Sequence, residues 1–355
     1  MPYHGKLRQL GKACIAHCNS GFIRARRGTT AGVEGARCFS TSKSNDMRFV
    51  QFVNKNGGPQ HLGVQLKDGG DIIAISSIDS RIPNNLRKFL EGGEVLAQKA
   101  RRNGDTNLSD YVQRIIAEGR SVIAEADVNF LAPINRMDKL LCVGLNYRGH
   151  CQEQGLELPN NPVIFNKFPS NIIGPTDNIV LPTNSEKVDW EAELAIVIGK
   201  IGKDLNEEDA ERCIFGYTVA QDISARDLQK GKINGGQFLL GKAMDTFCPL
   251  GPAVVTKEAI PDVHNLTVKT WVNEDLKQNG NTSELVFNPG KIVAYISKFM
   301  TLLPGDVILT GTPQGVGFAR KPPEYLKKGD ILQTEIESVG RLNNKVVQSE
   351  PKIKN

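Results

Sequence analysis

The segment 188–199, VDWEAELAIVIG, constrains the fold of this chain most strongly. It first alternates and then becomes continuously apolar, a pattern that predicts a β-strand. In an extended strand, Glu191 and Glu193 project from the same face, about 7 Å apart along the chain. Two like charges placed in this way repel each other, and glutamate is a poor strand former. Either this face contacts solvent, which is the ordinary arrangement, or a divalent cation compensates the two charges.

A third carboxylate, Asp222, favours the cation. It ends a second predicted strand, residues 214–221, where a solvent-exposed turn would more naturally carry a glycine. Three carboxylates on strands, with no cysteine or histidine nearby in the sequence, define a site of oxygen ligands that suits Mg²⁺ or Mn²⁺ better than zinc. We therefore predict that Glu191, Glu193 and Asp222 hold a metal ion. Mg²⁺ would keep open coordination positions for the oxygens of a substrate.

Cationic and polar side chains follow Asp222 in the sequence. Arg226 and Gln229 lie about one helical turn beyond it, where an arginine can bind a carboxylate through two parallel hydrogen bonds. Lys242 closes the apolar run 238–240, which makes it a candidate for a lowered pKa and for catalysis. The ordinary alternatives are a structural ion pair for Arg226 and a Lys242 side chain that extends to solvent.

A histidine and a glutamate follow an earlier predicted strand, residues 140–145. His150 and Glu153 are three residues apart and would share one face of a helix. A histidine oriented by a carboxylate is the usual general-base pair, because the acid fixes the tautomer and stabilises the imidazolium. The ordinary alternative is a surface pair without a catalytic role.

A glycine-rich segment, LTGTPQGVG at 309–317, follows another predicted strand. The backbone N–H groups of such a turn, together with the Thr312 hydroxyl, could bind a carboxylate. The segment lacks the lysine of a phosphate-binding P-loop and the glycine spacing of a dinucleotide-binding fingerprint. We therefore exclude nucleotide binding at this turn.

Short β-prone runs broken by glycine turns make up most of the chain. Between Met47 and Ser76 they predict a small antiparallel meander. The remaining expected elements are helices over 86–102 and 111–118, a strand over 121–131, strands at 140–145, 191–199, 214–221, 266–272, 307–310 and 331–336, and short helices capped by Asn206 and by Asn288, the second running to about Thr301. We predict a β-rich α+β protein with a small N-terminal domain, residues 47–131, and a catalytic domain, residues 133–350.

Residues 1–45 differ from the rest of the chain in charge. They carry eight basic side chains and one acidic side chain, which is typical of a mitochondrial transit peptide. The alternative is a basic tail that is not removed from the protein. The remaining residues carry 36 basic and 38 acidic side chains, so the body of the protein is nearly neutral and nucleic-acid binding is not expected. No apolar run approaches the ~20 residues that span a bilayer, so we expect no membrane segment.

Taken in chain order, these motifs resemble the fumarylacetoacetate hydrolase superfamily. The matching patterns are GxNYxxHxxE, PVIFxK, DxExELAxVIG, QDxSARD, GK and TGTPxGVG, which cover about residues 133–347. The resemblance implies a mixed β-roll or sandwich catalytic domain, usually homodimeric, with Mg²⁺ or Mn²⁺ on the three carboxylates. It places the catalytic dyad on a mobile lid at His150 and Glu153, and substrate contacts at Arg226, Gln229, Lys242 and Thr312, with Lys167 and Tyr147 as further matching positions.

Several reactions use such a site, and each begins with a small 2-oxo acid bound to a metal ion that stabilises developing enolate charge. The subfamily that this chain resembles implies a Mg²⁺-dependent keto–enol tautomerase that converts enol-oxaloacetate to keto-oxaloacetate in the mitochondrial matrix. Lys242 or the His150–Glu153 pair would move the proton. The alternatives are C–C hydrolysis of an acylpyruvate, decarboxylation of oxaloacetate and, in a different class, a metal-stabilised binding protein without turnover.

Overall fold

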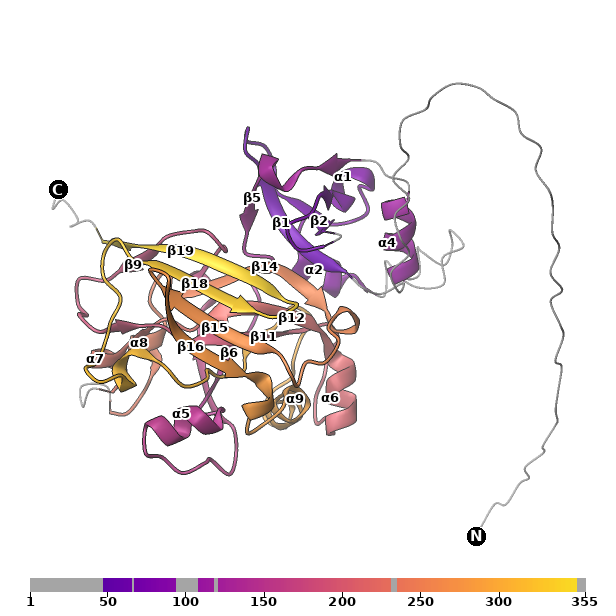
Figure 1. Ribbon diagram of the computed structural model, residues 1–355. Helices are drawn as coiled ribbons and strands as arrows, with labels where there is room; N and C mark the ends of the chain where they lie inside the picture. Colours follow the sequence, from indigo (N-terminus) through magenta and orange to yellow (C-terminus); the bar gives the residue numbers. More distant parts are fainter. Residues whose placement is uncertain (1–46, 66, 94–107, 118–120, 231–234, 350–355) are drawn as a thin grey trace, which may run out of the picture. The chain divides into compact units, whose positions relative to one another are not determined.

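The computed structural model describes residues 47–349, except residues 66, 94–107, 118–120 and 231–234. These described residues belong to one compact unit, drawn in Figure 1. The expected leader, residues 1–45, lies outside the described residues, as do residues 94–102 of the helix expected over 86–102. Strands outnumber helices and dominate the fold, which confirms the predicted β-rich α+β class.

Twelve strands form the larger sheet. Along its main path the order is β4-β3-β2-β1-β14-β12-β11-β17-β6-β7, while β5 pairs with β1 and β8 pairs with β14. The strands span Arg48–Asn54 (β1), His61–Gln65 (β2), Ile72–Ile73 (β3), Val122–Ile123 (β4), Val128–Leu131 (β5), Leu140–Gly144 (β6), Val163–Lys167 (β7), Ile172–Ile173 (β8), Ala192–Ile198 (β11), Ile214–Gln221 (β12), Cys248–Thr256 (β14) and Val307–Leu309 (β17).

The predicted N-terminal meander is present as the antiparallel strands β1, β2 and β3. Its third strand ends earlier than expected, because helix α1 (Ile75–Ile78) begins where the strand was expected to continue. There the Ser76 hydroxyl accepts a hydrogen bond from the Leu62 N–H of β2, at 2.9 Å. Strand β1 also pairs with β14, so the sheet continues across the expected domain boundary near Ala132. The division into two domains therefore stays a prediction.

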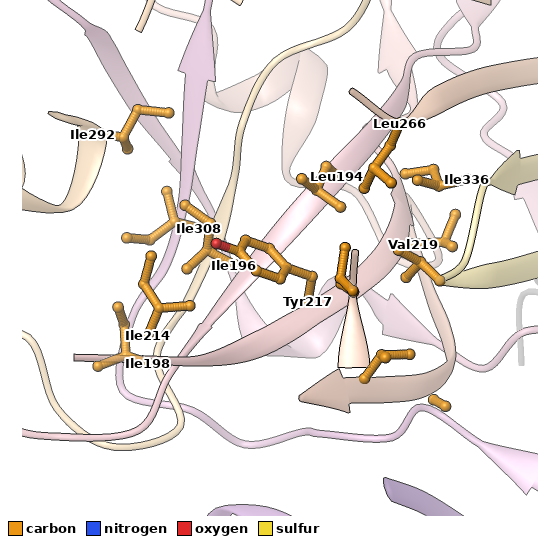
Figure 2. Close-up of a cluster of buried hydrophobic side chains, with 14 of the residues drawn as sticks. Leu194, Ile196, Ile198, Ile214, Tyr217, Val219, Leu266, Ile292, Ile308 and Ile336 are labelled. Carbon is orange, nitrogen blue, oxygen red and sulfur yellow. The ribbon is translucent and has the colours of Figure 1, made fainter. Parts of the chain in front are cut away.

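A second, five-stranded sheet packs on the central strands of the first. Its order is β16-β15-β18-β19-β9, and the strands span Asp275–Asn281 (β16), Thr267–Val272 (β15), Ile331–Ile336 (β18), Gly340–Gln348 (β19) and Ile179–Leu181 (β9). Buried and more exposed residues alternate along β15, β18 and β19, as in an antiparallel sheet with one face on a core. Figure 2 shows this core, where Leu194 and Ile196 of β11 meet Tyr217 and Val219 of β12 and Ile336 of β18.

The helices are short, and asparagine caps begin three of them: Asn85 at α2 (Leu86–Glu91) and the two predicted caps, Asn206 and Asn288. Asn206 accepts a hydrogen bond from the Asp209 N–H at the start of α6 (Glu207–Cys213), and Asn288 accepts one from the Lys291 N–H at the start of α9 (Pro289–Ser297). Helix α9 ends about one turn before the predicted Thr301. The others are α4 (Leu108–Ala117), α5 (Arg148–Glu153), α7 (Arg226–Gln229) and α8 (Leu239–Lys242), and a 3₁₀ turn, η1 (Glu125–Asp127), divides the strand expected over 121–131. Within the described residues, no helix has the length and apolarity needed to cross a membrane.

We expect Ile196→Ala to lower the free energy of unfolding by about 3 kcal/mol, because Ile196 is fully buried in the core of Figure 2 and its truncation leaves a cavity. Urea denaturation followed by circular dichroism measures the change. Ile201→Ala is the matched control, because the Ile201 side chain is 66% exposed. Equal losses in the two variants would contradict this account of the core.

Candidate active site

The pairing of β11 with β12 brings the three predicted carboxylates together. Glu193 lies opposite Ala220, and the Asp222 N–H donates to the Glu191 carbonyl at 2.9 Å, so Asp222 lies opposite Glu191. Residues directly opposite each other in an antiparallel pair point to the same face. Glu191, Glu193 and Asp222 are all buried, and each offers an oxygen that lies within 4.8 Å of the other two. The convergence of these side chains, predicted from the sequence, is confirmed.

Three buried cations surround this carboxylate cluster. Lys242 Nζ lies 2.7 Å from Glu191 Oε2 and 2.6 Å from Asp222 Oδ2. Lys167 Nζ lies 2.8 Å from Asp222 Oδ1 and also donates to the backbone carbonyls of Ile223 and Lys242. Arg226 Nη2 lies 2.6 Å from Glu191 Oε1. Buried charges need such partners, because removing one leaves an uncompensated buried charge.

The positive charge is unevenly distributed over the three carboxylates. Burial opposes ionisation of Glu191, but Lys242 and Arg226 outweigh it and hold the pKa of Glu191 well below its usual range. Burial, Asp222 and Glu191 together raise the pKa of Glu193 well above its usual range, because Lys242 and one backbone N–H only partly compensate them. A divalent cation would supply the missing charge, and its preference for carboxylate oxygens fits this donor set.

The expectation of a lowered pKa for Lys242 is wrong. Burial lowers the pKa of Lys242, but the neighbouring carboxylates of Asp222 and Glu191 outweigh burial and raise it. The sequence shows that an apolar run precedes Lys242, but it does not show that the short helix α8 directs its ammonium group at two carboxylates.

Asp189 is a further buried carboxylate at the site, and it was not among the predicted residues. Its Oδ2 accepts a hydrogen bond from Arg226 Nε at 2.8 Å. The short strand β10 (Val188–Asp189) pairs with β13 (Ser224–Ala225) and places Asp189 opposite Ser224, beside Arg226. Asp189 opens the DxExE pattern in the sequence, so its position in the motif was the signal that could have identified it.

The glycine-rich turn after β17 binds carboxylates of the protein itself. The Gly311 N–H donates to Glu193 Oε2 at 2.6 Å, the Gly315 N–H to Glu153 Oε2 at 2.8 Å, and the Gly317 N–H to Asp189 Oδ1 at 2.7 Å. Gly311 and Gly315 both have φ near +99°, a conformation that glycine adopts without strain. The turn therefore binds carboxylates, as predicted, and these belong to three side chains of the site.

Two buried glutamines connect the site to the second sheet. Gln221 Oε1 accepts from the Glu191 N–H at 2.8 Å, and its Nε2 donates to Thr334 Oγ1 at 2.8 Å. Gln278 Oε1 accepts from the Ala192 N–H at 2.9 Å, while its Nε2 donates to Thr312 Oγ1 at 2.8 Å. These bonds satisfy the N–H groups of Glu191 and Ala192, where β11 begins. Neither glutamine was among the predicted residues.

A cavity of about 200 Å³ opens onto two of the three carboxylates, Glu191 and Glu193. Of the predicted site residues, its wall contains Glu191, Glu193, Arg226, Gln229, Lys242 and Thr312. Tyr147 and Lys167 are buried and are not wall residues, so their contact with substrate stays a prediction. The remaining wall residues are Val143, Gly144, Leu145, Gln154, Leu156, Phe165, Lys230 and Phe238.

The predicted dyad is formed on helix α5. His150 Nδ1 lies 2.5 Å from Glu153 Oε1, and the imidazole is buried. The other ring nitrogen, His150 Nε2, lies 2.9 Å from Gln154 Nε2. His150 is not a wall residue of the cavity, but its neighbour Gln154 is. The dyad therefore lies at the edge of the cavity, and its electrostatic influence reaches Glu191.

A larger cavity of about 370 Å³ lies elsewhere in the unit, and its wall combines Phe49, Phe89 and Phe215 with the basic residues Lys200, Arg212 and Lys257. Among the described residues that form its wall, Glu258 is the sole carboxylate. A cluster of convergent polar groups marks a catalytic pocket better than size does. We therefore assign the chemistry to the smaller cavity.

The chain is similar to known proteins over most of its length. The family described as fumarylacetoacetate (FAA) hydrolase C-terminal matches residues 139–347. The chain therefore belongs to the fumarylacetoacetate hydrolase family, whose members typically depend on a divalent metal ion.

Two relatives and one solved structure illustrate the similarity. The chain is 49% identical over 311 residues to a Xenopus laevis protein named oxaloacetate tautomerase fahd2, mitochondrial, covering 88% of this chain and 93% of that protein. It is also 49% identical over 304 residues to the Homo sapiens oxaloacetate tautomerase FAHD2A, mitochondrial, covering 86% and 93% of the two chains. The structure of a fumarylacetoacetate hydrolase from Exiguobacterium antarcticum has a TM-score of 0.72 and 34% identity, covering 85% of this chain and all of that one.

We expect Glu193→Gln to separate metal binding from folding. In EDTA the variant should melt at or above the wild-type temperature, because a neutral amide replaces a buried carboxylate whose charge Asp222 and Glu191 oppose. Saturating Mg²⁺ should raise the melting temperature of the wild type by several degrees and leave that of Glu193→Gln unchanged. Differential scanning calorimetry with and without EDTA measures both effects. Glu186→Gln, at an exposed position, is the control, and equal stabilisation of Glu193→Gln by Mg²⁺ would remove Glu193 from the metal site.

Proposed function

We propose that this protein is a Mg²⁺-dependent tautomerase that converts enol-oxaloacetate to keto-oxaloacetate. The observation that carries the proposal is the buried cluster of Glu191, Glu193 and Asp222 beside a small cavity whose wall includes three basic side chains, those of Arg226, Lys230 and Lys242. Relatives that are 49% identical over most of the chain are named oxaloacetate tautomerases, which supports this reaction. A cavity of about 200 Å³ suits a small acid rather than a large ligand.

The three carboxylates would hold the Mg²⁺ ion, with Mn²⁺ as the other metal that this donor set suits. When bound, the ion would act as a Lewis acid that polarises the 2-oxygen of the substrate. Lys242 already contacts Glu191 Oε2 and Asp222 Oδ2, so its ammonium group would compete with the ion for these two oxygens. Lys167 would continue to hold the other oxygen of Asp222 in place.

Polar groups in the cavity wall are oriented to receive carboxylates. Thr312 Oγ1 accepts from Gln278, which leaves its hydroxyl hydrogen for an acceptor in the cavity. Gln229 Oε1 accepts from Arg226 Nη1 at 2.8 Å, so its amide N–H groups are available as donors. A guanidinium has five N–H groups. The guanidinium of Arg226 is held in place by contacts with Asp189, Glu191 and Gln229. Its remaining N–H groups would bind a substrate carboxylate.

The geometry supports His150 rather than Lys242 as the proton carrier. Lys242 Nζ is already a donor to two carboxylates, whereas Glu153 holds His150 in the orientation of a general base. The enol hydroxyl would lose its proton to His150 Nε2, replacing the hydrogen bond from Gln154 Nε2, and the imidazolium would return a proton to the neighbouring carbon. One proton changes position, and the carbonyl forms without any change in composition. Lys242 would stabilise the negative charge that develops on the oxygen.

The relatives' names also bear on location and assembly. Both are named mitochondrial, and the basic composition of residues 1–45 agrees with that location. We place the protein in the mitochondrial matrix and propose that residues 1–45 act as a transit peptide. We further propose a homodimer, the assembly that the family resemblance implies. The proposed substrate is a small 2-oxo acid.

A hydrolase is the second candidate, because the similar structure from Exiguobacterium antarcticum is a fumarylacetoacetate hydrolase. In that reaction the His150–Glu153 pair would take a proton from water, which would attack the distal carbonyl of an acylpyruvate. Decarboxylation of oxaloacetate would also begin at the same carboxylates. The three reactions differ in their products, so product analysis separates them.

We expect the purified protein with Mg²⁺ to accelerate the loss of enol-oxaloacetate absorbance without forming pyruvate. EDTA should remove the acceleration, and so should Glu191→Ala, because Glu191 contributes to the metal-binding cluster. Pyruvate released from oxaloacetate would indicate a decarboxylase, and pyruvate with a second acid from acylpyruvates would indicate a hydrolase. Metal-dependent thermal stabilisation without any of these activities would indicate a binding protein.

We expect His150→Gln to lower kcat for the tautomerisation by about 10²-fold or more, the usual contribution of a positioned general base. Stopped-flow absorbance at saturating substrate measures kcat, and His264→Gln, at an exposed position, is the control. A His150→Gln enzyme with full activity, together with an inactive Lys242→Met enzyme, would transfer the proton-carrying role to Lys242.

A further inference from the structure

A continuous series of hydrogen bonds runs from Lys230 to the glycine-rich turn. Lys230 Nζ donates to Gln154 Oε1 at 2.9 Å, and Gln154 Nε2 lies 2.9 Å from His150 Nε2. His150 Nδ1 lies 2.5 Å from Glu153 Oε1, and Glu153 Oε2 accepts from the Gly315 N–H at 2.8 Å. The series connects helix α5 at one end to the residue after helix α7 and at the other to the turn that follows β17.

The chemistry of the two ends fixes the direction of every bond. An ammonium group has only donors, so the oxygen of the Gln154 amide must face Lys230, and its NH₂ group must face His150. The NH₂ group has only donors as well, so His150 Nε2 must be the unprotonated nitrogen. At the other end, a carboxylate that accepts from the Gly315 N–H also accepts from Nδ1–H of His150. Neither end allows the opposite tautomer without placing two donors or two acceptors against each other.

We propose that Gln154 and Lys230 are positioning residues that hold His150 in the tautomer with the proton on Nδ1 and the lone pair on Nε2. The use of that lone pair as a base rests on the proposed function, whereas the tautomer itself does not. The sequence alone suggests only that Glu153 orients His150. The structure adds a second partner on the opposite nitrogen, and Lys230 determines which way that partner is turned.

The position of Lys230 is itself constrained. Its Nζ lies 3.5 Å from the centre of the Phe318 ring, where the face of an aromatic ring attracts a cation. The Phe318 N–H in turn donates to Asp189 Oδ2, the oxygen that also binds Arg226. Burial and the nearby Arg226 lower the pKa of Lys230 to about 8, so at neutral pH the group is still mostly the cationic donor. Phe318 and Asp189 therefore connect Lys230, which orients Gln154, to Arg226 of the proposed substrate site.

Nitrogen-15 spectra of histidine in the full-length protein test the proposal. The chain contains five histidines, so labelling only histidine gives a simple spectrum, and the signals lost in His150→Gln identify His150. Near neutral pH we expect the wild type to show a protonated Nδ1 and an unprotonated Nε2. Lys230→Arg keeps an obligate donor and should keep this tautomer. Lys328→Met, at an exposed position, is the control, and unchanged His61 and His264 signals show that each variant is folded.

Two substitutions should change the tautomer. Lys230→Met frees the Gln154 amide to turn, so a second population with a proton on Nε2 should appear. Gln154→Glu presents only acceptors, so Nε2 should become protonated, and kcat should fall by about tenfold or more while KM changes much less. A wild-type His150 with a proton on Nε2, or a tautomer unchanged by Gln154→Glu, would overturn the inference. If the tautomer responds as expected but His150→Gln remains fully active, the inference stands and the proposed role of His150 in catalysis is wrong.

Discussion

The site depends on the register between β11 and β12. Pairing Glu193 with Ala220 sets Asp222 opposite Glu191, and the two-residue period of the strands then puts all three carboxylates on one face. A slip of one residue would move both glutamates to the opposite face of β11, into the apolar core shown in Figure 2. The apolar side chains of that core, such as Leu194 and Ile196, therefore specify the position of the charged residues as well as the stability of the sheet.

Keeping these charges buried requires a partner for nearly every polar atom around them. Lys167, Lys242 and Arg226 supply positive charge, and the glycine-rich turn supplies N–H groups to three carboxylates. Buried networks of this kind stabilise one arrangement when every member is satisfied and are costly when one partner is lost, by about 3–5 kcal/mol for a buried ion pair. The same network orients the groups that face the cavity, so the residues that stabilise the fold here are also the proposed catalytic groups.

Much of the strand pattern could be predicted from the sequence. Residues 214–221 and 331–336 form strands with the predicted limits, because β-prone runs between turn residues leave few alternatives. Strand β14 was not predicted, because Pro249, Gly251 and Pro252 are residues typical of turns. Its register is set by pairing with β1 and β12. Helix α1 replaced part of a predicted strand because Ser76 satisfies the edge of β2, a contact between residues that are not adjacent.

The sequence by itself determined the residue types of the candidate site: two glutamates two residues apart, an aspartate directly after a predicted strand, and a histidine three residues before a glutamate. Only the tertiary structure decided what each group contacts. In the folded protein, the N–H groups of the glycine-rich turn bind the protein's own carboxylates, and Arg226 pairs with Asp189. The neighbours of Lys242 raise its pKa, and Gln154 contacts His150. Local patterns fix how side chains alternate along one strand or helix, whereas charge, burial and hydrogen-bond direction depend on neighbours that are distant in the chain.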